Sequence, residues 1–344
     1  SCQVLSQFDE AISYYRKAIE MAAVADDLSA EGMWNGHLGR LYRNRGQMDE
    51  ALACTKEALR IAVESDDLRD ESFWSDRLGL VYRSTGQLPN ALESHKRGLA
   101  LAREVGDLRG EGASLSNLGL VHYVLGDLDN AAECYTKALS IAAKIGDRRG
   151  EAIRNNRLGR TALDRGKNAT AKEAFDKALS IATKHGDRRE QAYALIGLAQ
   201  IRLASGEDRE AIAQLVQARN MHTTETDYLA CLAVAIARYR VSGEEAYSSF
   251  ADAIDSCQEL LNQSESLFEV RYALAIARTG LNVCNRSWTE PAGRSVLLEP
   301  NLNDYRQALN SCYARGVVER TIKDIGYLRQ AGADGLDPIL QMLN

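Results

Sequence analysis

Proline is scarce in this sequence, with 4 residues in 344. Proline interrupts helices because it lacks an N–H group and its ring collides with the preceding turn. The alternation of apolar and polar residues that marks half-buried strands is missing as well. In contrast, the helix-favouring residues Ala, Leu, Glu and Arg are abundant. These shortages argue against a β-rich domain, and the chain is predicted to be helical nearly throughout.

Long apolar runs and an excess of positive charge are also lacking. No stretch approaches the roughly 20 apolar residues of a membrane-spanning helix, and no charged and apolar leader opens the chain. The net charge is -6 and the pI is near 5.6, unlike the basic balance of nucleic-acid-binding proteins. We therefore expect a soluble, cytoplasmic protein that has neither nucleic acid nor membrane as a partner.

Paired cysteine motifs are absent. The 7 cysteines are odd in number and widely spaced, and none belongs to a Cys-x-x-Cys pair, which argues against both a disulfide framework and a zinc site. The cysteines are expected to be reduced packing residues: Cys2, Cys54, Cys134, Cys231, Cys257, Cys284 and Cys312.

Catalytic motifs are missing too. The nearest approach to a phosphate loop, from Gly159 to Gly166 and Lys167, has the wrong spacing and continues with Asn168 in place of Ser or Thr. The zinc-protease and serine-hydrolase motifs do not occur, and the 5 histidines lie far apart without ligand spacing. The sequence predicts no enzyme activity, no cofactor and no metal site.

What the chain does contain is a repeat with a period of 40 residues. A Leu-Gly pair recurs, and becomes Leu-Ala in the fifth unit. Further columns hold Gly or Ala, and such self-similarity is typical of a solenoid, in which each unit buries its apolar face against its neighbours. The glycine column is Gly46, Gly86, Gly126, Gly166 and Gly206; the Leu-Gly column begins at Leu38, Leu78, Leu118, Leu158 and Leu198.

Each period contains two helical segments, which we term helix A and helix B. In the third unit helix A is expected over residues 109–124 and helix B over 129–144. Gly126 and Gly146 follow them, where a left-handed residue ends a helix most easily. Asp107 and Asp147 are expected to cap the next A helices. Each unit is therefore predicted to be a hairpin of two antiparallel helices.

The order Leu-Gly, an aromatic residue, Gly, Ala and Ala-Leu resembles the tetratricopeptide repeat in its long form of about 40 residues. The resemblance covers roughly residues 1 to 221. It implies an all-α fold, an α-α superhelix of antiparallel hairpins with a helical C-terminal cap. The long form is similar to arrays in kinesin light chains, in polarity scaffolds and in STAND-type signal-transduction ATPases.

Regularity decreases along the chain. We expect a regular array over residues 1–226, with a partial first repeat and five complete ones. Degenerate helix pairs and capping helices are expected over 227–344, with an irregular insertion at 283–302 that contains two prolines. The closing stretch resembles the C-terminal ends of STAND sensor arrays. Because Ser6 occupies the glycine column, the chain is expected to be a fragment of a longer protein.

The resemblance also implies that one stripe of each A helix faces the concave side. Carrying over the family's inward positions gives an apolar middle between arginine-bearing turns, which suits a carboxylate-bearing or anionic ligand with an apolar part. Alternatively, these arginines are solvated or bridge neighbouring helices. The predicted groove residues are His37, Arg40, Arg43, Phe73, Arg77, Leu80, Arg83, Asn117, Leu120, Tyr123, Arg157, Arg160 and Tyr193.

Three functions fit this groove. The favoured hypothesis is the sensor region of a STAND-type ATPase, which would bind a protein, a peptide or a small anionic or amphipathic effector and regulate an upstream nucleotide-binding domain of the same parent chain. The second is a constitutive adaptor of the kinesin-light-chain or polarity-scaffold type, which docks a peptide or protein. The third is an accessory array of an effector enzyme. All three bind without making or breaking bonds.

Overall fold

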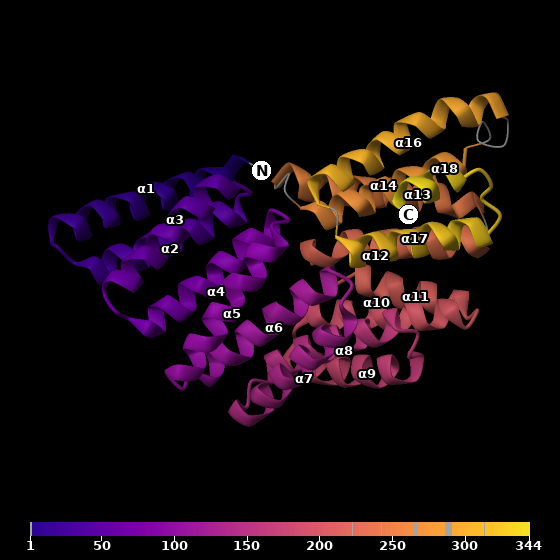
Figure 1. Ribbon diagram of the computed structural model, residues 1–344. Coiled ribbons are helices and arrows are strands. Elements are labelled where there is room, and N and C mark those ends of the chain that lie inside the picture. Colours follow the sequence, from indigo (N-terminus) through magenta and orange to yellow (C-terminus); the bar gives the residue numbers. More distant parts are fainter. Residues whose placement is uncertain (1, 222, 242, 264–266, 286–290, 313) are drawn as a thin grey trace. The chain divides into compact units, whose positions relative to one another are not determined.

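The computed structural model describes residues 2–221, 223–241, 243–263, 267–285, 291–312 and 314–344 (Figure 1). Within these ranges the regular secondary structure is entirely helical, so the predicted all-α fold is confirmed. The chain divides into two compact units. Among the described residues, unit 1 consists of 2–121 and residue 263, and unit 2 consists of those from 122 to 262 and from 267 to 344.

The helices follow the predicted alternation of A and B segments. Unit 1 contains α1 (Cys2–Val24), α2 (Leu28–Asn44), α3 (Met48–Glu64), α4 (Leu68–Ser84), α5 (Leu88–Glu104) and the part of α6 (Leu108–Val124) up to residue 121. Unit 2 contains the end of α6, α7 (Leu128–Ile145), α8 (Arg148–Asp164), α9 (Asn168–His185), α10 (Arg188–Ala204), α11 (Asp208–Arg219), α12 (Thr224–Val241), α13 (Gly243–Gln263), α14 (Phe268–Val283), α16 (Pro291–Ser311), α17 (Arg315–Gln330) and α18 (Asp337–Leu343).

Local sequence explains where the hairpins turn. Gly126 follows α6 with a φ of 82°, in the left-handed region that glycine enters without steric cost. The turns after the B helices use the same conformation, and there Asp66 takes it with a φ of 53°. Asp67 then caps α4, because its carboxylate accepts hydrogen bonds from the backbone N–H groups of Arg69 and Asp70, both at 3.0 Å. The predicted helix limits therefore agree with the structure to within a residue or two.

Small residues in the A helices let the two helices of a hairpin approach closely. A Cβ atom on Gly79 would lie 2.6 Å from the His95 ring, and one on Gly159 would lie 2.8 Å from the ring of Phe175. Both ring positions belong to one B-helix column, so a single residue fills the gap that the glycine leaves. The alanine columns are sealed in the same interfaces: Ala51, Ala58, Ala91, Ala131, Ala138, Ala171, Ala178, Ala211 and Ala218 are all 0% exposed.

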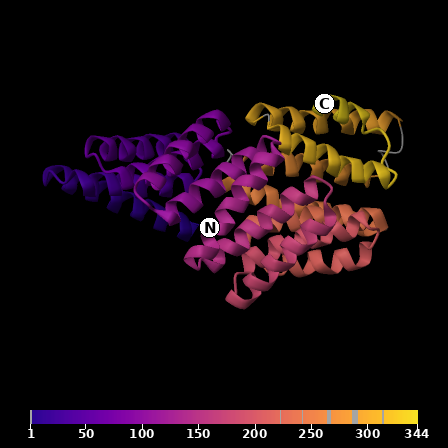
Figure 2. The same ribbon diagram turned by 60° about the horizontal axis from the view of Figure 1, so that its bottom comes forward.

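The C-terminal helices continue this packing in a less regular form. α14 packs on both α12 and α17, and α16 packs on α14 and α18, as the views in Figures 1 and 2 also show. Gly280 of α14 faces the ring of Phe250 in α13, which repeats the glycine-to-ring contact of the regular hairpins. The expected boundary at residue 226 concerns the regularity of the repeats and stays a prediction.

One expectation about this region was wrong. Residues 283–302 were expected to form an irregular insertion, but α14 extends to Val283 and α16 begins at Pro291. Residues 286–290 lie outside the described part. Pro291 occupies the first helical position, where its missing N–H group has no helical partner to lose. Pro300 lies inside the helix and removes one main-chain hydrogen bond there. Because prolines usually indicate a loop, these two led the sequence analysis to miss the helix α16.

Two general findings concern the whole described chain. None of its helices is long and apolar enough to cross a membrane. The six cysteines whose side chains are described, from Cys54 onwards, form no disulfide bonds.

Candidate functional site

In unit 1 the A-helix face begins with a row of aromatic rings. The ring centroids of Tyr15 and Trp34 lie 5.9 Å apart, and His37 lies 5.9 Å from Trp34 and 6.4 Å from Trp74. Trp74 is buried against Gly36, where only a glycine leaves room for the indole ring. Phe73 meets Trp74 edge-on at 4.6 Å and is 45% exposed. Phe73 thus presents an exposed aromatic ring that rests on a buried one.

Arginines surround this aromatic row. The guanidinium of Arg77 lies over the Phe73 ring, 4.7 Å from its centroid, within the range of a cation–π interaction. Arg43 is half-buried beside Arg40, Arg77 and Arg83, and burial together with these like charges lowers the pKa of Arg43 to about 10. Burial, followed by the charge of Arg40, also lowers the pKa of His37. These arginines therefore lie close enough together on this face to repel one another.

A buried polar group lies directly beneath these arginines. Asp76 of α4 lies 2.8 Å from Nδ1 of His95 in α5, and it accepts a hydrogen bond of 2.9 Å from the side-chain amide of Asn117 in α6. Asp76 is 4% exposed and His95 is fully buried. Burial opposes ionisation of Asp76, but His95, Arg77 and Asn117 stabilise the carboxylate and hold its pKa below the usual range. This group fixes three helices together under the predicted groove.

In unit 2 the corresponding positions are paired with protein groups. The Tyr123 hydroxyl donates a hydrogen bond of 2.6 Å to Asp164, and Nε of Arg160 donates one of 3.1 Å to the Tyr123 oxygen. Nη1 of Arg160 donates to the side-chain oxygen of Gln200 at 2.6 Å. Burial alone would lower the pKa of Arg160, but Tyr123 and the nearby carboxylates raise it above the usual range. Burial raises the pKa of Tyr123 to about 12.

Helix α17 adds a second layer over these residues in unit 2. Its Arg320 places the guanidinium 4.4 Å from the centre of the Tyr123 ring. One turn later, Asp324 faces Arg160 and Asp164, and burial raises the pKa of its carboxyl to about 6. At the start of the helix, a Cβ atom on Gly316 would overlap the carbonyl oxygen of Tyr123. The A-helix face of unit 2 is thus partly occupied by the chain itself.

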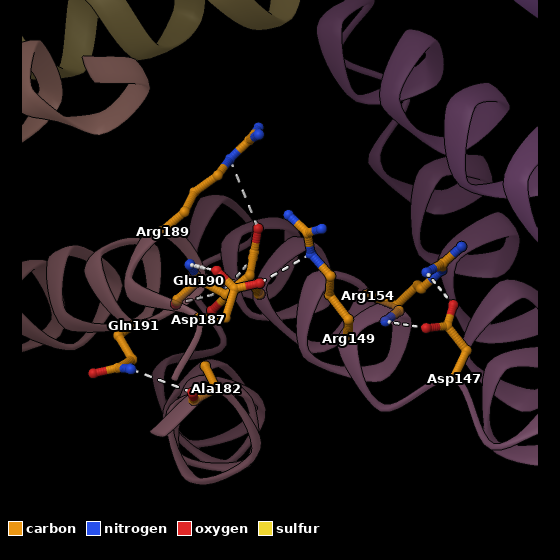
Figure 3. A network of polar contacts seen from close by, with 10 residues as sticks. Asp147, Arg149, Arg154, Ala182, Asp187, Arg189, Glu190 and Gln191 are labelled. Carbon is orange, nitrogen blue, oxygen red and sulfur yellow. Dashed lines mark hydrogen bonds and ion pairs between the residues drawn. The ribbon is translucent and has the colours of Figure 1, made fainter. Parts of the chain in front are cut away.

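Further along unit 2, the loops before α8 and α10 carry their own polar network (Figure 3). Arg149 pairs with Asp187 at 3.0 Å, and Arg154 lies 3.7 Å from Asp147. Buried Glu190 accepts a hydrogen bond of 2.9 Å from Asn156, although burial raises its pKa. The other predicted residues lie on these helices, with Arg157 over the Tyr135 ring at 5.7 Å and Tyr193 beneath Arg189 at 5.8 Å.

The predicted groove residues therefore fall into two sets. Nine lie in unit 1: His37, Arg40, Arg43, Phe73, Arg77, Leu80, Arg83, Asn117 and Leu120. Four lie in unit 2: Tyr123, Arg157, Arg160 and Tyr193. Within unit 1 the aromatic and arginine positions come together, whereas Asn117 turns to Asp76 and the side chains of Leu80 and Leu120 are half-buried.

Comparison with known protein families agrees with this architecture. A family model described as tetratricopeptide repeat matches the overlapping ranges 29–104, 71–144, 110–184 and 151–224, and a second one of the same description matches residues 5–24. The chain belongs to the tetratricopeptide repeat family. Tetratricopeptide arrays are protein-binding scaffolds, typically without catalytic activity. A search of curated proteins found no match.

Solved structures with the same fold include BtubC and Rap proteins. BtubC (BKLC) from P. vanneervenii is 20% identical with a TM-score of 0.55, and the match covers 62% of this chain and 90% of BtubC. The apo form of RapI is 14% identical with a TM-score of 0.62, over 85% of this chain and 99% of RapI. A Rap protein in complex with Competence and Sporulation Factor is 13% identical with a TM-score of 0.55, over 95% and 99% of the two chains.

The tetratricopeptide array also contains site residues that sequence reasoning missed. Asp76 and His95 both depart from their columns in the same repeat, since Gly36 and Thr55 occupy these positions one unit earlier. A comparison of paired departures within one repeat could have found them. The contact between Tyr123 and Asp164 joins two successive repeats, so neither this contact nor those of α17 had such a signal. Among the described residues, no group of three or more His, Cys, Asp and Glu side chains is arranged to hold a metal ion.

Proposed function

We propose that this tetratricopeptide array binds an effector on the A-helix face of unit 1, in contact with Phe73 and the surrounding arginines. The observation that carries the proposal is the exposure of Phe73, because a large aromatic side chain 45% open to solvent on a buried aromatic base loses little entropy on binding. Apolar and cationic groups lie side by side there, so a protein, a peptide or a small amphipathic anion fits this face.

The known structures support a binding role in general terms. A Rap protein of the same fold was solved in complex with Competence and Sporulation Factor, so this fold can hold a separate factor. In the present chain the binding face would belong to unit 1, because Arg160 in unit 2 already has a protein partner, Asp164.

We further propose that binding is regulatory, and that the array is the sensor region of a STAND-type ATPase with an upstream nucleotide-binding domain. The long repeats and the C-terminal sequence motivate this assignment. The sequence of the parent gene tests it, because a phosphate loop encoded upstream is required. A coiled-coil region in that place would instead identify a constitutive adaptor of the kinesin-light-chain or polarity-scaffold type, and a catalytic Cys and His would identify an effector enzyme.

Peptide binding tests the site itself. Peptides selected from a displayed random library on the full chain are measured by fluorescence anisotropy against three variants. Phe73→Ala and Arg77→Glu are expected to weaken binding by about tenfold or more, as for residues at the centre of an interface. Lys96→Glu is the matched control, because this exposed lysine lies on the B helix α5. Selected peptides that bind all three variants equally well would place the binding site elsewhere.

A further inference from the structure

Arginine side chains gather on the A-helix face of unit 1. Arg43 lies among Arg40, Arg77 and Arg83, and their repulsion contributes to its low pKa. In the described part of the chain, no carboxylate lies within ion-pair distance of Arg40, Arg43 or Arg77. Burying like charges side by side lowers stability. The arrangement therefore has a cost that an external anion would remove.

The nearest carboxylate is already engaged. Asp76 attracts Arg43 and Arg77 electrostatically, but its oxygens are 2.8 Å from His95 and 2.9 Å from Asn117. Its carboxylate oxygens are therefore occupied by His95 of α5 and Asn117 of α6. One buried carboxylate offsets a single charge, so a positive excess remains on the A helices α2 and α4.

The geometry of Arg77 points to a ligand that carries hydrogen-bond acceptors for its guanidinium. Stacking on Phe73 fixes its guanidinium at 4.7 Å from the ring. Its Nε is buried without a hydrogen-bond acceptor among the described residues. Because this Nε is buried, an external carboxylate would pair with the terminal Nη groups of the guanidinium, whose plane the Phe73 ring orients. The apolar surface of Phe73 and Leu80 lies beside it for an adjacent side chain.

We propose that Arg40, Arg43 and Arg77 bind carboxylate side chains of an acidic peptide segment, an assignment that rests on the proposed function of this face. A short acidic segment suits the site better than a nucleic acid. The chain as a whole carries a net charge of -6, so a long polyanion would meet repulsion beyond this local cluster.

Two short fluorescein-labelled peptides provide the test, one of alternating Glu and Leu and one in which every Glu is Gln. With the full chain at moderate salt, the Glu peptide is expected to bind about tenfold or more tightly than the Gln peptide. Arg43→Gln and Arg40→Gln should each remove most of this preference, whereas Lys96→Gln, on the B helix, should leave it unchanged. Melting temperatures separate binding from folding, because Arg43→Gln is expected to melt no lower than the wild type.

The outcomes distinguish this inference from the proposed function. Equal binding of the two peptides that still depends on Phe73 would overturn the acidic ligand class and leave the binding face in place. Tighter binding of a single-stranded oligonucleotide than of the Glu peptide, lost in Arg43→Gln, would also overturn it. If neither peptide binds and the library selection yields none that depends on Phe73, both proposals fail.

Discussion

The two units use the same A-helix positions in opposite ways. In unit 1, Arg40, Arg43 and Arg77 lie near one another without ion-pair partners among the described residues. In unit 2, Arg160 is held by Tyr123 and Gln200 and lies 3.7 Å from Asp164. The repeat thus determines the position of each side chain on its helix. Whether an arginine at that position has a neighbouring protein group determines whether its charge stabilises the fold or is available to a ligand.

The difference arises from two features outside the repeat pattern. Position 164 carries an aspartate, whereas the equivalent residue in the earlier repeats is Asn44, Ser84 or Val124. Unit 2 also has α17, whose Arg320 and Asp324 add charges of both signs to its face. The charge of Arg160 is therefore compensated within unit 2, whereas in unit 1 Asp76 is the carboxylate that attracts Arg43 and Arg77.

The strongest test of this comparison is one substitution made in both units. Arg160→Met is expected to lower the free energy of unfolding by about 3 kcal/mol, because it removes the positive charge beside Asp164 and the hydrogen bonds to Tyr123 and Gln200. Arg43→Met is expected to raise it by about 1 kcal/mol, because it removes a half-buried charge from a cluster of like charges. Urea unfolding of both variants measures the two values. Losses of similar size would show that the arginines of the two units are equivalent.

The next test concerns the contact between α17 and the end of α6. Gly316→Ala is expected to lower the free energy of unfolding by about 2 kcal/mol, because the new methyl group overlaps the backbone at Tyr123. Gly326→Ala, in the same helix, is the matched control. Nothing lies within 4 Å of a Cβ atom at that position, so higher helix propensity should raise stability by about 0.5–1 kcal/mol. If both variants melt alike, α17 does not lie tightly against α6.

The smallest expected effect is a pH dependence in unit 2. Asp324 faces Arg160 and Asp164 of α8 and Arg320 and Lys323 of its own helix, and burial raises its pKa from 3.8 to about 6. A raised carboxyl pKa means that the folded protein binds the proton more tightly, so this contribution is full below about pH 4 and is lost as the pH rises through about 6. Asp324→Asn should flatten the stability profile between these values. Parallel profiles for wild type and variant would contradict the raised pKa.

Much of the fold could be predicted from the sequence, because a solenoid repeats its local rules. The glycine after each A helix, the aspartate caps and the alanine columns each act within one hairpin or between neighbours. Gly126, Asp147 and Ala138 accordingly have the expected conformation, cap or burial. The prediction failed over residues 291–302, where the two prolines suggested a loop and Pro291 instead begins α16.

The site could be predicted only in part. The repeat register indicated which A-helix positions share a face, but not which of their charges have partners. The His95 interaction with Asp76 crosses from an A helix to the next B helix, at positions that hold Gly36 and Thr55 one unit earlier. The contact of Arg320 with Tyr123 joins residues far apart in sequence, which no repeat period encodes.

The contact at Gly316 has a mechanical consequence. In an open stack of helical hairpins the last pair can fray while the remainder stays folded, because each pair touches only its neighbours. In unit 2, α17 reaches back to the turn after α6, so helices from late in the sequence brace the first segment of the unit. A force that pulls on the two ends of unit 2 would have to break the contacts between α17 and α6 before any hairpin could unfold. Unit 2 is therefore expected to unfold in one cooperative step under force.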